Sequence, residues 1–216
     1  MAVVKRVNNR IAILARPRTG STSLYKLFQS HLDSYMCFLE PFNPKWTLFY
    51  SNHEIDFLYI DPFVQHDRVL CKTLYGCGQY PVRSVGLLEK AFTEWMSTYF
   101  DKVIVLDRRD KQAQAESLLI NQDSDTSWHE PKIYDVSKLD GNRLENEITQ
   151  MTQISDNMTQ VALERSWPIF YYEDLYLDHN MNEINRMFNY AEIVMDEAKV
   201  YDFIISDKRK VRIDLS

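Results

Sequence analysis

The sequence of 216 residues has little glycine, few cysteines and no long apolar run. Its three cysteines, Cys37, Cys71 and Cys77, form no CxxC pair, so a disulfide framework or a zinc site is not expected. That cysteine usage favours a reducing compartment. No apolar run approaches the roughly 20 residues that span a bilayer, and the N-terminus lacks an apolar signal core with a cleavage site. We therefore expect a cytoplasmic protein that enters no membrane.

The charge of the chain is acidic overall but uneven. A formal net charge of −6 argues against a general nucleic-acid binder, which would be basic. Residues 1–32 nevertheless carry six basic side chains and no acidic one. A basic segment in an acidic protein suggests a local anion site, although a solvated basic surface is the commoner explanation of a charge run.

Short apolar runs alternate with amphipathic segments along the chain. The runs are rich in β-branched or aromatic residues and are bounded by polar residues, which predicts buried parallel strands. The expected strands are residues 11–15, 69–72, 103–107 and 169–172. The expected helices are residues 21–31, 85–99, 112–121 and 144–165. This alternation predicts an α/β fold with a central parallel sheet covered by helices on both faces. The length suits one domain over residues 1–216.

Two segments fall outside that alternation. Residues 121–143 are polar and aperiodic, with Pro131 and Gly141, and predict a long surface loop or lid. Residues 42–63 are crowded with aromatic side chains. Such a cluster could stack a sugar or a phenol, but it is more often plain core.

A tight turn joins the first expected strand to the first expected helix. The segment RPRTGSTS at residues 16–23 lies at this junction. The first N–H groups of a helix have no intrahelical partner, and the helix dipole adds positive charge there, so the turn can hold a phosphate. Gly20 allows close backbone approach, and Arg18 can donate two charge-assisted bonds. Hydroxyls for capping or for phosphate oxygens come from Ser21, Thr22 and Ser23.

This turn is not a nucleotide-hydrolysing P-loop. The pattern GxxxxGK[ST] needs a first glycine and a terminal lysine, and both are missing. The alternative is an N-capped helix after a strand, with arginines that are merely solvated.

Four motifs in order resemble those of the sulfotransferases that use 3′-phosphoadenosine 5′-phosphosulfate (PAPS). RTGST at residues 18–22 is similar to the turn that binds the 5′-phosphate in that family, in the form found in carbohydrate sulfotransferases. Arg109, at a strand end, and Ser117, eight residues on, look like the pair that holds the 3′-phosphate. The Glu40-Pro41 segment and YEDL at residues 172–175 match two further family segments. The order and spacing together are more specific than any one motif.

The resemblance implies a three-layer P-loop-like fold and PAPS as donor, with 3′-phosphoadenosine 5′-phosphate (PAP) as product and no metal. It implies a nucleotide site built from Arg16, Arg18, Thr19, Gly20, Ser21, Thr22, Ser23, Arg109 and Ser117. Arg108 is one residue out of register and is the weaker candidate for the 3′-phosphate. The glycine-rich C-terminal nucleotide loop of cytosolic members is missing, and Lys208, Arg209 and Lys210 are candidates for its work.

The expected chemistry is transfer of the sulfuryl group to a hydroxyl or amine. Arg18 would stabilise the charge that grows on the leaving phosphate, because an arginine supplies charge and hydrogen bonds. Glu40 is the candidate base, with a turn before Pro41 as its alternative role, and His53, His66 and His129 are less favoured bases. Lys72 points to the same sheet edge without an assigned role, and Asp174 is expected to be structural.

Two other functions stay open at this stage. A small-molecule kinase would need a Lys-Ser/Thr pair and magnesium carboxylates, which are not evident in the sequence. A non-catalytic module that binds PAP would keep the donor pocket and lack acceptor chemistry. The acceptor, whether a small molecule or a carbohydrate, and the oligomeric state are not specified by the sequence.

Overall fold

The computed structural model describes residues 9–40, 66–75, 86–123 and 139–205. Several predictions fall outside these residues and stay untested. They concern the aromatic segment 42–63, His53, His129, Pro41 and the basic cluster Lys208, Arg209 and Lys210.

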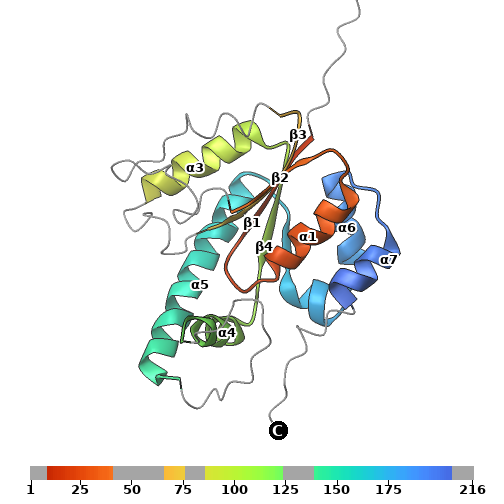
Figure 1. The fold of residues 1–216 in the computed structure, drawn as a ribbon. Helices are drawn as coiled ribbons and strands as arrows, with labels where there is room; N and C mark the ends of the chain where they lie inside the picture. Colours follow the sequence, from red (N-terminus) through yellow and green to blue (C-terminus); the bar gives the residue numbers. More distant parts are fainter. Residues whose placement is uncertain (1–8, 41–65, 76–85, 124–138, 206–216) are drawn as a thin grey trace, which may run out of the picture.

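A five-stranded sheet forms the centre of the described structure, and every pairing in it is parallel (Figure 1). The strand order is β2-β3-β1-β4-β5. The strands are β1 Asn9–Ala15, β2 Met36–Leu39, β3 Arg68–Leu74, β4 Lys102–Asp107 and β5 Ile169–Tyr171. The four predicted strands are confirmed. The edge strand β2 is not among them, because a four-residue segment with its two end residues exposed gives little periodic signal.

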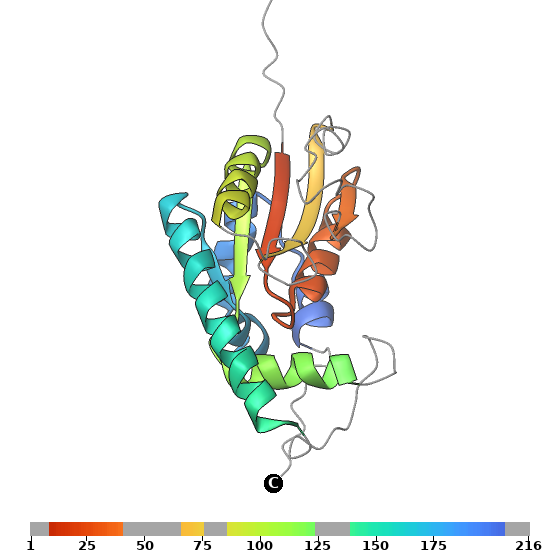
Figure 2. The same cartoon turned by 90° about the vertical axis from the view of Figure 1, so that its left-hand side faces the viewer.

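Helices cover both faces of this sheet and give three layers (Figure 2). On one face lie α1 (Ser21–His31), α6 (Met181–Ala191) and the short α7 (Glu197–Val200). The other face carries α3 (Gly86–Tyr99) and α5 (Gly141–Glu164). A further helix, α4 (Lys111–Asp123), packs on α5 through Ala115, Leu118 and Met151. The predicted α/β fold with a covered parallel sheet is therefore confirmed.

The central strand β1 shows why both faces are apolar. Successive side chains of a strand point to opposite faces. Ile11 and Ile13 join the core under α1 and α6, whereas Ala12 and Leu14 join the core under α3 and α5. All four are 0% exposed, as a strand buried on both faces requires.

Helices extend into both ends of the predicted loop at 121–143, and residues 124–138 lie outside the described residues. α4 continues to Asp123, and α5 begins at Gly141 rather than at residue 144. The reason is an N-cap, because the Asp140 carboxylate accepts hydrogen bonds from the N–H groups of Asn142 and Arg143. This cap extends the helix into a polar segment that has no apolar periodicity.

Two short π-helical turns complete the described chain. The turn η3 (Glu173–Leu177) follows β5, and η4 (Tyr201–Ile205) follows α7. In the described part of the chain, no helix combines the length and the apolar character that crossing a membrane requires.

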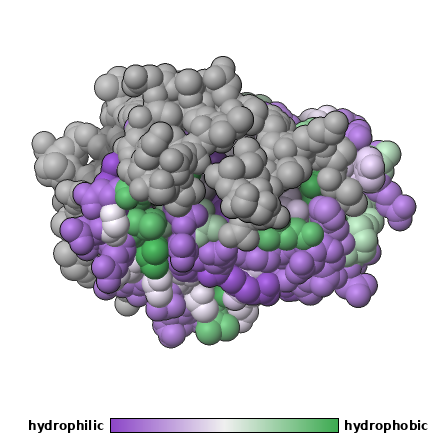
Figure 3. Space-filling model, turned by 90° about the horizontal axis from the view of Figure 1, so that it is seen from below, coloured by the Kyte–Doolittle hydropathy of each residue, from purple (hydrophilic) through white to green (hydrophobic). Residues whose placement is uncertain are grey.

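Because all the strands are parallel, their carboxyl ends meet at one edge of the sheet. β1 leads there into residues 16–20, β4 into Arg108 and β5 into η3. Ligands of open parallel sheets bind at this edge. The described surface on this side is mostly hydrophilic with a few apolar patches (Figure 3).

Candidate functional site

The turn after β1 presents the amino end of α1 at the carboxyl edge of the sheet. Gly20 is the N-cap residue, and no side chain caps the helix. The first N–H groups of the helix therefore remain available to an anion, with the positive end of the helix dipole behind them. Arg18 and Gly20 both have left-handed backbone angles, with φ of 65° and 77°. For Arg18 this conformation is strained, which is typical of functional turns.

Neighbouring elements hold this turn from several sides. The Thr19 hydroxyl donates to the Arg16 carbonyl over 2.8 Å, and the Gln114 amide donates to the Pro17 carbonyl over 2.7 Å. Thr19 is fully buried, so its hydroxyl serves the turn itself. Arg16 and Ser21 are also buried, at 3% and 4% exposure. The turn is thus held by its own side chains and by Gln114 of α4.

Tyr176 of η3 covers the glycine of the turn. Its hydroxyl donates to the Gly20 carbonyl over 2.9 Å. A Cβ placed on Gly20 would lie 2.5 Å from a ring carbon of Tyr176, which no real side chain tolerates. Glycine is therefore required here for two reasons, the positive φ and the tyrosine ring.

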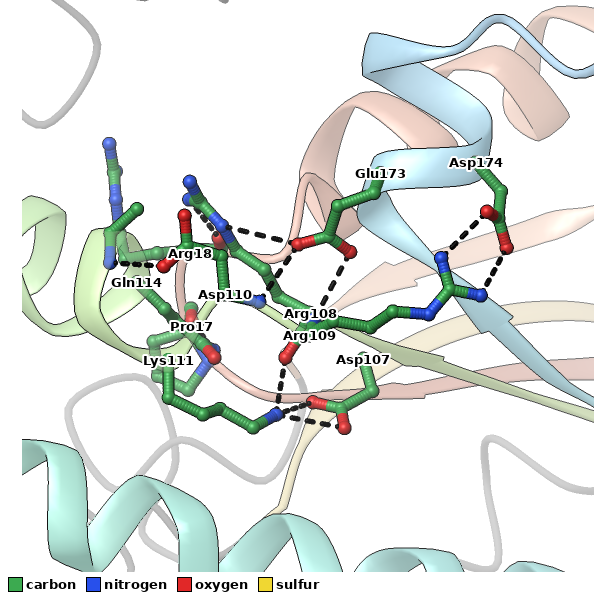
Figure 4. A network of polar contacts seen from close by, with 11 residues as sticks. Pro17, Arg18, Asp107, Arg108, Arg109, Asp110, Lys111, Gln114, Glu173 and Asp174 are labelled. Atoms are coloured by element: carbon green, nitrogen blue, oxygen red, sulfur yellow. Dashed lines mark hydrogen bonds and ion pairs between the residues drawn. The ribbon is translucent and has the colours of Figure 1, made fainter.

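Two arginines meet beside this turn. Arg18 donates from Nε to the Ser117 hydroxyl over 2.8 Å. Arg108 donates to the Arg18 carbonyl over 3.4 Å (Figure 4). Burial, and secondly the charge of Arg108, lowers the pKa of Arg18. The Arg108 guanidinium lies 4.6 Å from the centre of the Tyr172 ring, and its buried Nε has no hydrogen-bond acceptor in the described structure. Two adjacent cations, one of which has an unsatisfied hydrogen-bond donor, would be stabilised by a bound anion.

Arg109 turns away from Ser117. Its guanidinium makes two 2.7 Å hydrogen bonds to the Asp174 carboxylate and stacks 3.9 Å from the Tyr171 ring centre. The hydrogen bond to Asp174 raises the pKa of Arg109. The structure thus brings Ser117 to Arg18, which Arg108 also contacts, whereas Arg109 pairs with Asp174. Arg109 as a phosphate ligand stays a prediction. Asp174 has the structural role that the sequence predicts, because it holds the Arg109 guanidinium.

Glu173 fixes the start of α4. Its two carboxylate oxygens accept from the N–H groups of Arg109 and Asp110 over 3.1 and 3.0 Å. The nearest approach to Arg108 Nε is 4.0 Å, longer than a hydrogen bond. The carboxylate is therefore used mainly by the backbone, which leaves the charge of Arg108 only partly compensated.

Glu40 and Lys72 form an ion pair at the same edge. β2 and β3 are paired so that Leu39 lies opposite Lys72, and the Glu40 N–H donates to the Lys72 carbonyl over 2.8 Å. The Lys72 ammonium contacts the Glu40 carboxylate and lies 3.4 Å from the Thr22 hydroxyl. The side chains are 3% and 20% exposed. A lysine at the end of a buried strand was the sequence signal, but its partner could be seen only in three dimensions.

His66 is the remaining candidate base among the described residues. His66 precedes β3 and so lies at the opposite edge of the sheet from the turn. In the described ranges, no three His, Cys, Asp or Glu side chains gather as metal ligands would.

No model of a known protein family matches the sequence, and no curated protein sequence matches it. The structure is similar to that of mouse sulfotransferase SULT7A1 complexed with PAP, with a TM-score of 0.55 and 12% sequence identity. The match covers 92% of this chain and 63% of the mouse protein's chain. The chain therefore has the P-loop-like α/β fold of the sulfotransferases, and it spans less than two thirds of the neighbour's length.

We predict that Gly20→Ala destabilises the protein by about 1–3 kcal/mol, because the new methyl group would meet Tyr176 and the backbone angle is unfavourable. Gly141→Ala is the matched control, since nothing lies within 4 Å of its added Cβ. The control should be neutral or gain up to about 1 kcal/mol. Urea unfolding of both variants measures the difference, and equal stabilities would contradict the close approach.

Proposed function

We propose that the protein transfers the sulfuryl group of PAPS to a hydroxyl or amine acceptor. The observation that carries this proposal is the pair of adjacent guanidiniums, Arg18 and Arg108, beside the uncapped amino end of α1. One phosphate at the turn beside Arg18 and a second at Arg108 match a nucleotide with phosphates on both its 5′ and 3′ oxygens. The fold similarity to a PAP-bound sulfotransferase supports the same donor.

The two phosphates would use different parts of the site. The N–H groups at the start of α1 and the Thr22 hydroxyl suit the 5′-phosphate, since Thr22 lies in the first turn of the helix. Arg108 suits the 3′-phosphate because its Nε is unsatisfied, and Ser117 on α4 is the hydroxyl that the family resemblance pairs with an arginine for that phosphate. This assignment replaces the sequence-based choice of Arg109 with its neighbour.

The reaction asks for positioning and charge neutralisation. The bond from sulfur to the bridging phosphate oxygen breaks as a new bond forms from sulfur to the acceptor, and negative charge stays on the phosphate. Arg18 would stabilise that charge, and Lys72, which is buried beside Thr22, is another cation near the turn.

The acceptor must lose a proton, and Glu40 is the proposed base. Its carboxylate lies at the carboxyl edge between β2 and the turn, in contact with Lys72. Lys72 would hold the carboxylate at the place where the acceptor arrives. A small molecule and a carbohydrate both remain candidate acceptors.

We expect PAP to raise the melting temperature far more than ATP with magnesium does. The turn lacks the P-loop lysine, and Arg108 with Ser117 suits a 3′-phosphate that ATP does not have. At a hundredfold excess over its dissociation constant, a ligand adds about 2.7 kcal/mol of stability. A thermal-shift comparison of PAP with ATP, ADP and AMP is sufficient, and equal shifts would remove the proposal.

A second prediction separates the two neighbouring arginines. Arg108→Ala should weaken PAP by on the order of 1.5–3 kcal/mol relative to adenosine 5′-phosphosulfate, which has no 3′-phosphate. Arg109→Ala removes the bonds to Asp174 and should leave the ratio of the two affinities unchanged. Calorimetric titration of both variants with both ligands measures this ratio. The opposite pattern would restore Arg109 as the 3′-phosphate ligand.

A third prediction separates catalysis from donor binding. Arg18→Ala should lower kcat by roughly 10²–10³, the range for losing one preorganised stabilising group. Its donor affinity should fall less, because the helix N–H groups remain. Glu40→Gln keeps the shape of the side chain and should lower kcat with nearly unchanged PAP affinity.

Measuring these rates requires an acceptor, so a screen of hydroxyl and amine compounds comes first. If Arg18→Ala lost affinity and kept kcat at saturation, Arg18 would be a ground-state anchor. If PAP bound tightly and no acceptor reacted, the protein would be a nucleotide-binding module.

A further inference from the structure

Side chains of the π-helical turn η3 and of Tyr172, the residue before it, contact three parts of the candidate nucleotide site. Glu173 bonds the backbone at the start of α4, and Tyr172 lies under Arg108. Tyr176 bonds Gly20. The Tyr172 and Tyr176 rings are themselves in contact, with centroids 5.1 Å apart. A π-turn is rare and is often found at functional sites.

Of these contacts, the one from Tyr176 acts on the peptide that opens α1. The Gly20 carbonyl accepts three hydrogen bonds, from the Tyr176 hydroxyl at 2.9 Å and from the N–H groups of Ser23 and Leu24 at 3.0 and 3.1 Å. The two backbone bonds belong to any helix start. The hydroxyl is the additional one, and it comes from an element 156 residues away in sequence.

Fixing this carbonyl also fixes an N–H group. The peptide that joins Gly20 to Ser21 is planar and trans, so its N–H points opposite to its C=O. With the oxygen held by Tyr176 and by the helix, the Ser21 N–H is directed out of the helix start. A carbonyl that accepts strong hydrogen bonds also polarises its own peptide and makes the N–H a better donor.

Glycine would otherwise make this peptide the least constrained in the turn. Gly20 can rotate between left-handed and right-handed conformations at little cost. The Tyr176 ring occupies the space of the missing Cβ and the hydroxyl holds the oxygen, so one side chain removes that freedom.

We propose that Tyr176 is a positioning residue that aims and polarises the Ser21 N–H toward the 5′-phosphate of the donor. The inference deepens the proposed function and rests on it. Tyr176 acts through the Gly20–Ser21 peptide and touches no ligand. Its effect falls on the 5′-phosphate, whereas Arg108 and Ser117 act on the 3′-phosphate.

The test compares Tyr176→Phe with the wild-type protein on three ligands: PAP, adenosine 5′-monophosphate and adenosine 3′-monophosphate. The variant keeps the ring and loses only the hydroxyl. It should bind the first two ligands about 3–10-fold more weakly, the equivalent of one hydrogen bond, and the 3′-monophosphate unchanged. Tyr201→Phe, at a tyrosine that is 55% exposed, is the control and should change none of the three.

A spectroscopic measurement accompanies the titrations and needs no ligand. Loss of the hydroxyl bond should move the Gly20 carbonyl carbon and Ser21 amide proton resonances upfield, while resonances of the distant helix α5 stay in place. The shifts would show that the hydroxyl polarises the Gly20–Ser21 peptide, and the selective loss of 5′-phosphate binding separates this role from one in folding alone.

The outcomes separate the two proposals. If wild-type protein bound none of the three nucleotides, the proposed function and this inference would both be wrong. If wild-type protein bound PAP, and Tyr176→Phe weakened all three ligands equally or none, the inference alone would be overturned. Unchanged Gly20 and Ser21 resonances in the variant would overturn it as well.

Discussion

The charges of the neighbouring residues Arg108 and Arg109 are compensated unequally, and the properties of the carboxyl edge of the sheet depend on this difference. Arg109 is matched by Asp174 through two short hydrogen bonds, whereas Glu173 is occupied by backbone N–H groups. The Arg108 guanidinium lies against the Tyr172 ring, its Nε has no hydrogen-bond acceptor in the described structure, and Arg18 is its charged neighbour. Adjacent cations at a half-buried site repel each other, so an anion placed between them gains more than it would at a solvated surface.

The parallel sheet makes this balance possible. Every strand delivers its carboxyl end to one edge, so segments far apart in sequence supply the turn, the arginines and the ion pair of Glu40 with Lys72. A buried lysine is costly unless it is paired. Lys72 is 3% exposed at its side chain, and Glu40 and Thr22 both lie within its reach, which ties the edge strand β2 to the start of α1.

The turn η3 has a comparable function on the other side of the site. Its side chains reach the amino ends of both α1 and α4. Helix starts at a sheet edge attract anions in many folds. The particular arrangement here adds an aromatic surface, because Tyr172 carries Arg108 and Tyr176 covers Gly20.

Sequence alone determined the covered parallel sheet, the strands β1, β3, β4 and β5, the strand–turn–helix junction at residues 16–23 and the importance of Gly20. These follow from local patterns, because apolar periodicity and a strand–turn–helix junction are written in consecutive residues. Sequence favoured Arg109 over Arg108 from its spacing to Ser117, but it could not show that Arg109 pairs with Asp174, because adjacent residues at a strand end point in different directions. Nor could it find the partner of Lys72 or the contact of Tyr176 with Gly20. Those were decided by tertiary structure, since each joins side chains from elements that only the packing of the sheet edge brings within a hydrogen bond.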